Sequence, residues 1–196
     1  MSRSSDKAVE TRRRVLKEAA AAIRTVGPEG IGVAALMNKV GLTHGGFYAH
    51  FDSKDNMVAE AIGQMFDESY ELFLKLTAGV SPQQGLVSYI DMYLSARHRD
   101  DRETGCPIPS LSGDLARMST PTRERFFAGF ERLRRGIAKL LKQSQCGSSN
   151  RLADSMLAEM VGAVAISRAI RDTPASTQVL EAARESIKSR LGLEKL

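Results

Sequence analysis

The chain has 196 residues, of which 42% are hydrophobic and 26% are charged, as in an ordinary soluble globular protein. No apolar run approaches the roughly 20 residues that span a bilayer, and the polar N-terminus lacks the apolar core of a signal peptide, so we expect a cytoplasmic protein with no membrane partner. Only two cysteines occur and no His/Cys cluster has the spacing of a zinc site, which argues against a disulfide framework, a metal or another cofactor.

Positive charge is concentrated near the N-terminus. Residues 1–54 hold nine Lys/Arg and five Asp/Glu, and therefore carry +4 of the net charge of +5. A basic head on a nearly neutral body indicates a polyanionic partner, although a basic tail taken alone is often only a solvated tail.

Apolar residues recur at helical spacing almost throughout, and no alternating strand pattern or internal repeat is visible, so we predict an all-α protein of about nine helices. The expected helices cover about residues 7–26, 33–40, 43–51, 54–76, 82–98, 110–118, 120–145, 152–171 and 177–191. Gly27 with Pro28 ends the first helix and Gly41 ends the second. Ser81 and Gln84 form a capping pattern at the start of the fifth.

The stretch GLTHGGFYAHFDSK, residues 41–54, has the pattern of a helix-turn-helix, because a short helix precedes the glycine turn and a second short helix follows it. Phe47 and Phe51 are four residues apart on one face of the second helix, where we expect them to anchor it in the core. The N-terminal end of this second helix enters the major groove in such motifs, and the glycines there allow the backbone to approach DNA closely.

The remaining residues of this stretch are candidates for DNA contacts. The Tyr48 hydroxyl is a common type of phosphate donor, and Lys54 opens the next helix, where its charge opposes the helix dipole unless a phosphate lies nearby. For His50, phosphate contact and helix capping both remain open, and His44 could contact a base or a phosphate. The candidate DNA-binding residues are Thr43, His44, Gly45, Gly46, Tyr48, His50 and Lys54.

The stretch VGLTHGGFYAHFDSK resembles the DNA-binding domain of TetR-type transcriptional regulators, whose signature is a glycine turn, a small polar cap and then Phe-Tyr-x-His/Tyr-Phe-x-Ser-Lys. The resemblance covers roughly residues 10–60. It implies a three-helix helix-turn-helix DNA-binding domain over residues 1–53 and a helical ligand-sensing and dimerisation domain over residues 54–196.

By position, the resemblance implies contacts to the DNA backbone for Tyr48, His50 and Lys54, and groove-facing positions for residues 43–46. Two residues depart from the family's pattern. Gly32 stands where a Ser or Thr often caps the second helix, and Met37 stands where a small Ala usually packs against the reading helix. The long Met37 side chain is expected to affect the angle between the two helices and with it the base contacts.

The segment MLAEMVGAVAISRAI, residues 156–170, is apolar on nearly every side and is therefore expected to be buried on nearly every side. A central position in the core of one chain and a position in a dimer interface both satisfy this requirement. The resemblance favours a homodimer held by a four-helix bundle, in which two reading helices about 34 Å apart meet two half-sites of DNA.

The resemblance also implies a small-molecule site among the later helices. Aromatic residues there could line a cavity, although such a stripe is more often plain core. Cys106 precedes a short helix, whose N-terminus can lower the pKa of a thiol and make it reactive, and a buried small hydrophobe is the alternative. The candidate ligand-binding or sensing residues are Cys106, Phe66, Tyr70, Tyr89, Tyr93 and Phe127.

No Gly-rich phosphate loop, HExxH or GxSxG motif occurs, so we expect no catalytic residues and no enzyme. The sequence predicts a DNA-binding transcriptional regulator, a repressor that binds a pseudo-palindromic double-stranded DNA operator as a homodimer and is released by a small-molecule or electrophile effector. The alternative is a DNA-binding regulator without small-molecule sensing, in an architectural or activator role.

Overall fold

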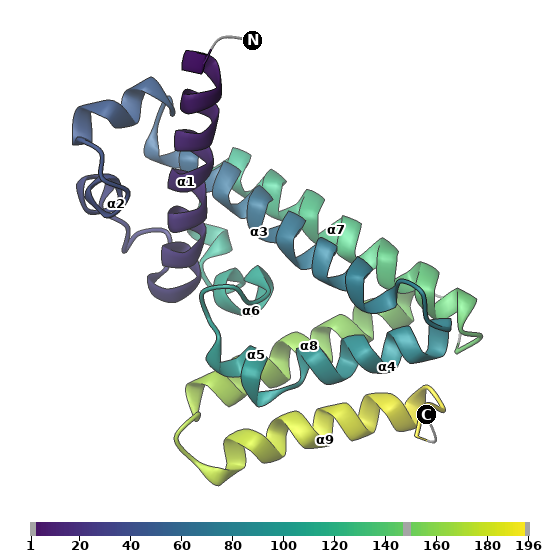
Figure 1. Ribbon diagram of the computed structural model, residues 1–196. Helices are drawn as coiled ribbons and strands as arrows, with labels where there is room; N and C mark the ends of the chain where they lie inside the picture. The colour runs from purple at the N-terminus through teal and green to yellow at the C-terminus, as the bar shows by residue number, and fades with distance from the viewer. Residues whose placement is uncertain (1–2, 147–149, 195–196) are drawn as a thin grey trace.

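The computed structural model describes residues 3–146 and 150–194, and within them the regular structure is entirely helical, which confirms the all-α prediction (Figure 1). The elements are α1 (Arg3–Val26), α2 (Val33–Lys39), η1 (His44–Ala49), α3 (Lys54–Thr77), α4 (Pro82–Tyr93), α5 (Ala96–Asp100), α6 (Pro107–Leu111), η2 (Leu115–Arg117), α7 (Thr120–Gln143), α8 (Asn150–Ala169) and α9 (Pro174–Arg190), where η denotes a 3-10 helix. None of the helices in these described ranges is both long and apolar enough to cross a lipid bilayer.

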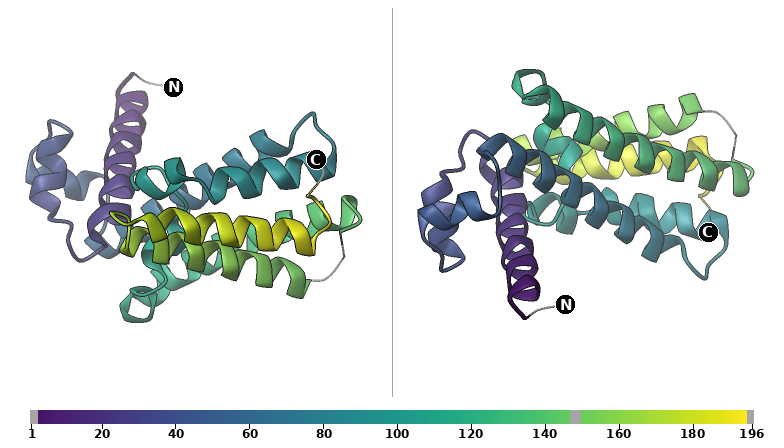
Figure 2. Two further views of the ribbon diagram at one scale, coloured as in Figure 1. Left: turned by 90° about the horizontal axis from the view of Figure 1, so that it is seen from below. Right: turned by 90° about the horizontal axis from the view of Figure 1, so that it is seen from above.

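Residues 3–50 gather at one end of the molecule, and the long helices α3, α4, α7, α8 and α9 lie together beside them (Figure 2). The two predicted glycine turns are present, because Gly27 and Gly41 adopt φ values of +77° and +74°. Ile23 of α1, Met37 of α2 and Phe47 of η1 are fully buried and belong to the same hydrophobic core. Apolar packing therefore holds the short second and third helices against α1.

Helix α3 joins the two parts of the molecule, since it packs on both α1 and α7. Ser53 caps it by accepting a hydrogen bond from the Asn56 backbone N–H at 3.0 Å. Gly129 of α7 allows an especially close approach, because a Cβ atom on Gly129 would lie 2.2 Å from Cγ of Phe66 on α3. The long linking helix is thus fixed along its length by direct contact with α7.

Two predicted helices differ from the structure. The helix expected over residues 82–98 has the predicted Ser81–Gln84 capping box, but it ends at Tyr93. A new helix begins after Ser95, whose hydroxyl accepts a hydrogen bond from the His98 backbone N–H at 3.1 Å. The break is stabilised by the His98 ring, whose Nδ1 lies 2.7 Å from the Tyr93 carbonyl oxygen. This ring-to-backbone contact depends on tertiary burial, so local helix signals did not reveal it.

The helix expected over residues 110–118 is also wrong in position. It is replaced by α6, which starts earlier because Pro107 occupies its first position, and by the short η2. Within the helix expected over residues 43–51, the structure has the 3-10 helix η1 over His44–Ala49 rather than a regular α-helix. Two of its six residues are glycines, which favour the α-helical conformation weakly.

Helices α8 and α9 form an antiparallel pair joined by a buried serine contact (Figure 1). The Ser167 hydroxyl donates to the Ser176 carbonyl oxygen at 2.7 Å, and both side chains are fully buried. One face of α8 is open in the single chain, so α8 is not buried on every side within the core of one chain, the first of the two alternatives. Ala158, Ile166 and Ala169 are exposed there, Ile166 to 54%.

Candidate functional site

The helix η1 is anchored by the two phenylalanines predicted to be core. Phe47 and Phe51 are 0% and 2% exposed, and their rings stack with centroids 5.3 Å apart. The Arg12 guanidinium of α1 lies 4.8 Å above the Phe51 ring, and its Nε donates to the His50 carbonyl oxygen at 3.2 Å. Arg12 belongs to α1, whereas His50 and Phe51 directly follow η1. These contacts therefore hold η1 in one orientation relative to α1.

Sequence reasoning missed the positioning role of Arg12, which it treated only as part of the basic N-terminal charge. Arg12 also forms an ion pair with Glu60 of α3. Its spacing of three and seven residues from the buried Val15 and Ala19 places it on the inner face of α1. That spacing is the signal that could have identified it.

The N-terminal end of η1 presents its polar groups outward. Thr43 occupies the N-cap position, but its side chain makes no capping hydrogen bond with the helix, so its hydroxyl does not stabilise the helix. His44 and Gly45 are exposed, and a Cβ atom on Gly45 would meet nothing within 4 Å. Tyr48 is 65% exposed and packs edge-on against Phe47, with centroids 5.2 Å apart, which orients its hydroxyl away from the core.

Met37 stands where the family usually has an alanine, and the chain accommodates this longer side chain beside Gly46. Met37 is fully buried, and a Cβ atom on Gly46 would lie 3.8 Å from its terminal methyl group and 3.6 Å from the Thr43 hydroxyl. The long methionine therefore fits beneath a glycine. Gly32, the other departure, caps α2 without any side-chain hydrogen bond, as expected.

The two remaining DNA-contact candidates lie at the other end of η1. His50 is half-buried at the C-cap position, where its backbone N–H donates to the Phe47 carbonyl oxygen at 2.9 Å. Lys54 lies on the first turn of α3, with Nζ 3.4 Å from the Glu29 carbonyl oxygen. All seven candidates are therefore exposed or half-buried, with Gly46, His50 and Lys54 half-buried.

Part of the basic charge of the N-terminal region is neutralised within the chain. Three of its cations, besides Arg12, form ion pairs with carboxylates: Arg13 with Glu10, Arg24 with Glu68 and Lys39 with Glu18. The hydrogen bond that Lys39 donates to the Glu18 carboxylate raises the pKa of Lys39. Among the described side chains, Lys7, Arg14, Lys17 and Lys54 have no carboxylate partner, and these cations remain available to a polyanion.

The aromatic residues predicted to line an effector site mostly pack against one another. Tyr70, Phe73, Tyr89, Tyr93 and His98 form a continuous series of ring contacts with successive centroid distances of 5.8, 5.1, 5.9 and 4.6 Å. Tyr89 and Tyr93 are almost completely buried, and this burial raises the pKa of both hydroxyls well above its ordinary value. Tyr89 and Tyr93 therefore fill the core rather than line an open cavity.

The other predicted effector residues are separated from this series. Phe66 is 1% exposed and packs edge-on against Phe126 at 5.1 Å. Phe127 points the other way from α7 and is 63% exposed, so its predicted place beside the other aromatic residues is wrong. The cause is the helical period, because the residue following a core residue on an α-helix lies about 100° around the helix.

Cys106 occupies the N-cap position of α6 but is only 6% exposed. Its backbone N–H donates to Nε2 of His98 at 3.1 Å. Burial raises the pKa of the thiol, and this effect exceeds the lowering by Tyr93 and the nearby Arg24 and Arg168 cations. The lowered pKa considered from the sequence is therefore wrong, and the structure favours the alternative of a small buried side chain.

The hollows on the surface are lined mostly by residues other than the predicted effector residues. A groove of about 600 Å³ between α3 and α7 is lined by Phe66 and Tyr70 among the predicted residues. A second hollow of about 290 Å³ lies between α3, α4 and α5, and we call it the α3–α5 hollow. Its lining residues, which sequence reasoning missed, are Leu72, Leu76, Met92, Ser95, Arg97, His98, Asp101, Thr104 and Gly105. No group of three potential metal ligands occurs among the residues that the structure describes.

Two family models match the sequence. Residues 15–61 match the model described as bacterial regulatory proteins of the tetR family. Residues 82–185, more than half of the chain, match the model of the C-terminal domain of LmrA/YxaF-like transcriptional regulators.

The chain belongs to the TetR family of transcriptional regulators.

Solved structures of TetR-family regulators have the same fold. A TetR transcriptional regulator from Chloroflexus aurantiacus J-10-FL is 27% identical, with a TM-score of 0.82, and the match covers 95% of this chain and 96% of that one. The reduced form of NemR from E. coli is 20% identical with a TM-score of 0.76, over 92% and 97% of the two chains. A TetR-family regulator from Agrobacterium tumefaciens is 19% identical with a TM-score of 0.78, over 92% and 98%. No curated protein matches the sequence.

Membership of the TetR family identifies the protein as a DNA-binding transcriptional regulator with a helix-turn-helix, formed here by α2 and η1. We expect the stability of this TetR-family protein to depend on pH through the buried His98. Burial lowers the pKa of His98 from 6.5 to about 4, and both ring nitrogens are engaged, with the Tyr93 carbonyl and the Cys106 N–H.

Because the unfolded chain binds this proton below pH 6.5 and the folded chain only near pH 4, we expect the free energy of unfolding to fall by up to about 3 kcal/mol between these pH values. Urea unfolding at pH 7, 6, 5 and 4 measures the effect. His98→Gln should flatten this part of the profile, while the surface variant His44→Gln should keep it. An unchanged profile in His98→Gln would contradict the assignment.

Proposed function

We propose that this TetR-family regulator is a repressor that binds a pseudo-palindromic operator as a homodimer and is released by a small-molecule effector. The observation that carries the proposal is the contrast between neighbouring residues of η1. Phe47 and Phe51 are buried to 2% exposure or less, whereas His44 and Tyr48 face outward from the same short helix. A rigid helix with a polar outer end suits insertion into the major groove.

Within this proposal, the exposed residues divide into two roles. Thr43 and His44, at the N-terminal end of η1, contact base edges, and Gly45 and Gly46 allow the backbone to approach the groove. Tyr48, His50 and Lys54 contact phosphates and set the position of the helix. The open space at Gly45 supports a close approach, because a Cβ atom there would meet no other atom within 4 Å.

The homodimer is supported by the open face of α8. Small and apolar residues are exposed along this face at Ala158, Ile166 and Ala169, with the half-exposed Gly162 between them. In a symmetric dimer the same patch of both copies meets itself, and small side chains allow two helices to approach closely. The face is thus suited to a second copy of the chain.

Selection of bound duplexes from random DNA tests the operator part of the proposal. We expect an enriched site with two inverted half-sites whose centres are separated by about one helical turn or a multiple of it. Enrichment of single half-sites, or of sequences that share no motif, would contradict the operator part of the proposal. Repeating the selection with candidate small molecules separates a ligand-released repressor from an architectural or activator protein, whose DNA affinity no small molecule changes.

Lys54 provides a test of the phosphate role. Lys54→Ala should weaken binding to all duplexes alike and reduce the slope of log affinity against log salt by roughly one unit, because one phosphate contact releases about one counterion. Fluorescence anisotropy over a series of salt concentrations measures the slope. A His44 substitution should instead change which sequence is preferred. If Lys54→Ala altered sequence preference at an unchanged salt slope, the two assignments would be wrong.

A further inference from the structure

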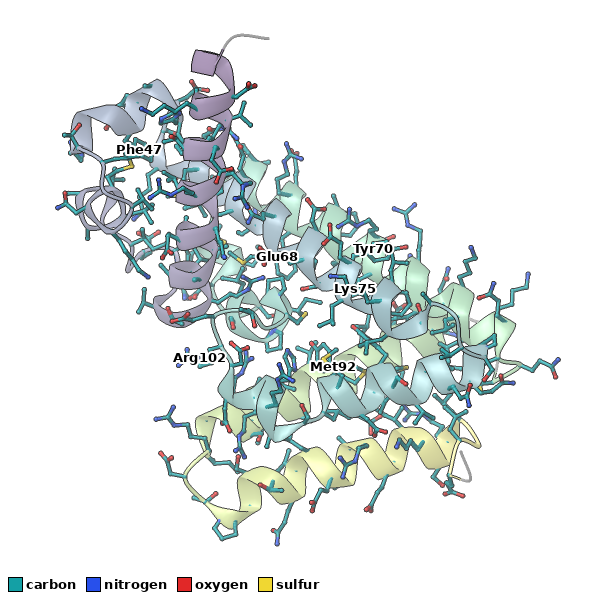
Figure 3. All side chains as sticks on the ribbon, in the orientation of Figure 1. Phe47, Glu68, Tyr70, Lys75, Met92 and Arg102 are labelled. Carbon is teal, nitrogen blue, oxygen red and sulfur yellow. The ribbon has the colours of Figure 1, made fainter. Side chains whose placement is uncertain are left out.

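The α3–α5 hollow has one apolar wall. Leu72 and Leu76 line it from α3, and Met92 lines it from α4. Figure 3 shows Met92 on the side of α4 that faces α3. Leu72 is 40% exposed although it is a large apolar residue, so its side chain is incompletely covered by the chain itself. An apolar ligand group would remove this surface from water.

Most polar groups around the hollow already have partners. The Ser95 hydroxyl donates to the Met92 carbonyl oxygen at 2.7 Å and accepts from the His98 backbone N–H at 3.1 Å. The Asp101 carboxylate accepts from the Thr104 hydroxyl at 2.6 Å and from its backbone N–H at 3.3 Å. Both ring nitrogens of His98 are engaged within the chain. These groups therefore offer a ligand little new hydrogen bonding.

Arg97 differs from the other lining residues. It is exposed at the hollow, and among the residues that the structure describes it has neither a side-chain hydrogen bond nor an ion pair. The neighbouring Arg99, by contrast, is bound to Asp100 at 2.8 Å and to Ser176 at 2.9 Å. The guanidinium of Arg97 has five N–H donors in a geometry that matches a carboxylate.

We propose that the α3–α5 hollow binds a small amphipathic carboxylate, with its hydrocarbon part against the apolar wall and its carboxylate on Arg97. The proposal rests on the function proposed above and specifies the chemical class of the effector. A volume of about 290 Å³ accommodates about ten non-hydrogen atoms, at roughly the 30 Å³ that one water molecule occupies in the liquid. Octanoate has this size and chemistry and serves as the probe.

The segment that closes the hollow is bonded to the helix-turn-helix region. Asp101 and Thr104 line the hollow, and the two residues between them contact the last turn of α1. The Glu103 carbonyl oxygen accepts from Arg24 at 3.0 Å, and Arg102 donates to the Thr25 carbonyl oxygen at 2.9 Å. Figure 3 places Arg102 beside the end of α1.

Arg24 extends this connection to the linking helix. It is 2% exposed, and it pairs with Glu68 of α3 at 2.7 Å while it holds Glu103. A carboxylate that binds more tightly when residues 101–104 are displaced therefore weakens the hydrogen bonds that join this segment to α1. The difference in affinity between the two arrangements is what shifts the protein away from its DNA-binding form.

Binding is tested by thermal shift and calorimetric titration with octanoate, 1-octanol and octylamine. We expect octanoate to bind most tightly and octylamine least, because only octanoate pairs with the guanidinium. Arg97→Met should weaken octanoate binding at least about tenfold, the effect of losing roughly 1.5 kcal/mol or more from a charged hydrogen bond. Arg151→Met, which removes an exposed arginine of α8, is the matched control and should bind octanoate as the wild type does. Equal binding of octanoate by Arg97→Met, or equal binding of octanol and octanoate by the wild type, overturns the proposal.

Coupling to DNA is tested with a duplex selected from random DNA. Octanoate should weaken binding of the wild type about tenfold, within the usual range of allosteric coupling. Arg102→Ala should bind octanoate normally and show a smaller loss of DNA affinity. If octanoate binds without changing DNA affinity, the coupling through residues 101–104 is wrong. If the protein binds a selected duplex but not octanoate, this inference fails and the proposed repressor function stands, whereas absence of any specific duplex overturns the proposed function itself.

Discussion

Replacing Phe47 with alanine is expected to remove about 3–5 kcal/mol from the free energy of unfolding and to abolish specific DNA binding. The ring is fully buried, it stacks on Phe51 at 5.3 Å, and it supports Tyr48 edge-on at 5.2 Å. Its loss leaves a cavity where η1 meets the rest of the fold. The helix then loses its fixed orientation relative to α1.

The adjacent Tyr48 provides the control. Tyr48→Phe removes only a hydroxyl from a side chain that is 65% exposed, so the free energy of unfolding should change by less than about 0.5 kcal/mol. Its DNA affinity should nevertheless fall several-fold per half-site, because one hydrogen bond to a phosphate is lost. Chemical denaturation and anisotropy titration on the same preparations separate the two effects. If both variants lost stability and affinity in the same proportion, the division of η1 into a buried anchor and an outward contact surface would be wrong.

The second large effect is expected at the open face of α8. Ile166→Glu places a carboxylate at a position that is 54% exposed in the single chain and becomes buried if α8 is the centre of a symmetric interface. Burying this charge against a second copy costs several kcal/mol, so the dissociation constant of the dimer should rise at least about a hundredfold. The fold of each chain should persist, because the side chain points away from the core.

Leu74→Glu is the matched control for this prediction. Leu74 is exposed to 47%, close to the exposure of Ile166, but it lies on α3 rather than α8. Analytical ultracentrifugation should find Ile166→Glu as a monomer and Leu74→Glu as a dimer, and Ile166→Glu should lose cooperative occupancy of two half-sites. A dimer that survives Ile166→Glu but not Leu74→Glu would place the interface on another face.

Local signals in the sequence identified the helix-turn-helix correctly. Gly27 and Gly41 have the positive φ angles that favour glycine, so their positions alone predicted where the first two helices end. The spacing of Phe47 and Phe51 predicted their burial for a similarly local reason, since residues four apart share one face of a helix. The capping pattern at Ser81 was equally readable, because donor and acceptor are only three residues apart.

The features that depend on distant partners could not be predicted in this way. Arg12 belongs to a basic run in the sequence, and its spacing from Val15 and Ala19 indicates only that it lies on the inner face of α1. Its contacts with Phe51 and Glu60, which define its support of η1, come from other parts of the chain. The thiol of Cys106 precedes a helix as expected, but burial against distant helices raises its pKa instead of lowering it.

The sequence by itself determined the all-helical character, the position of the helix-turn-helix and the burial of Phe47 and Phe51, because each of these follows from side chains close together in the chain. The tertiary structure alone decided which aromatic residues fill the core, where the α3–α5 hollow lies and that Arg97 is left without a partner beside it. These properties depend on how helices far apart in the chain cross and which side chains they cover. Helical periodicity gives the direction of a side chain around its own helix but not the identity of the group that it meets.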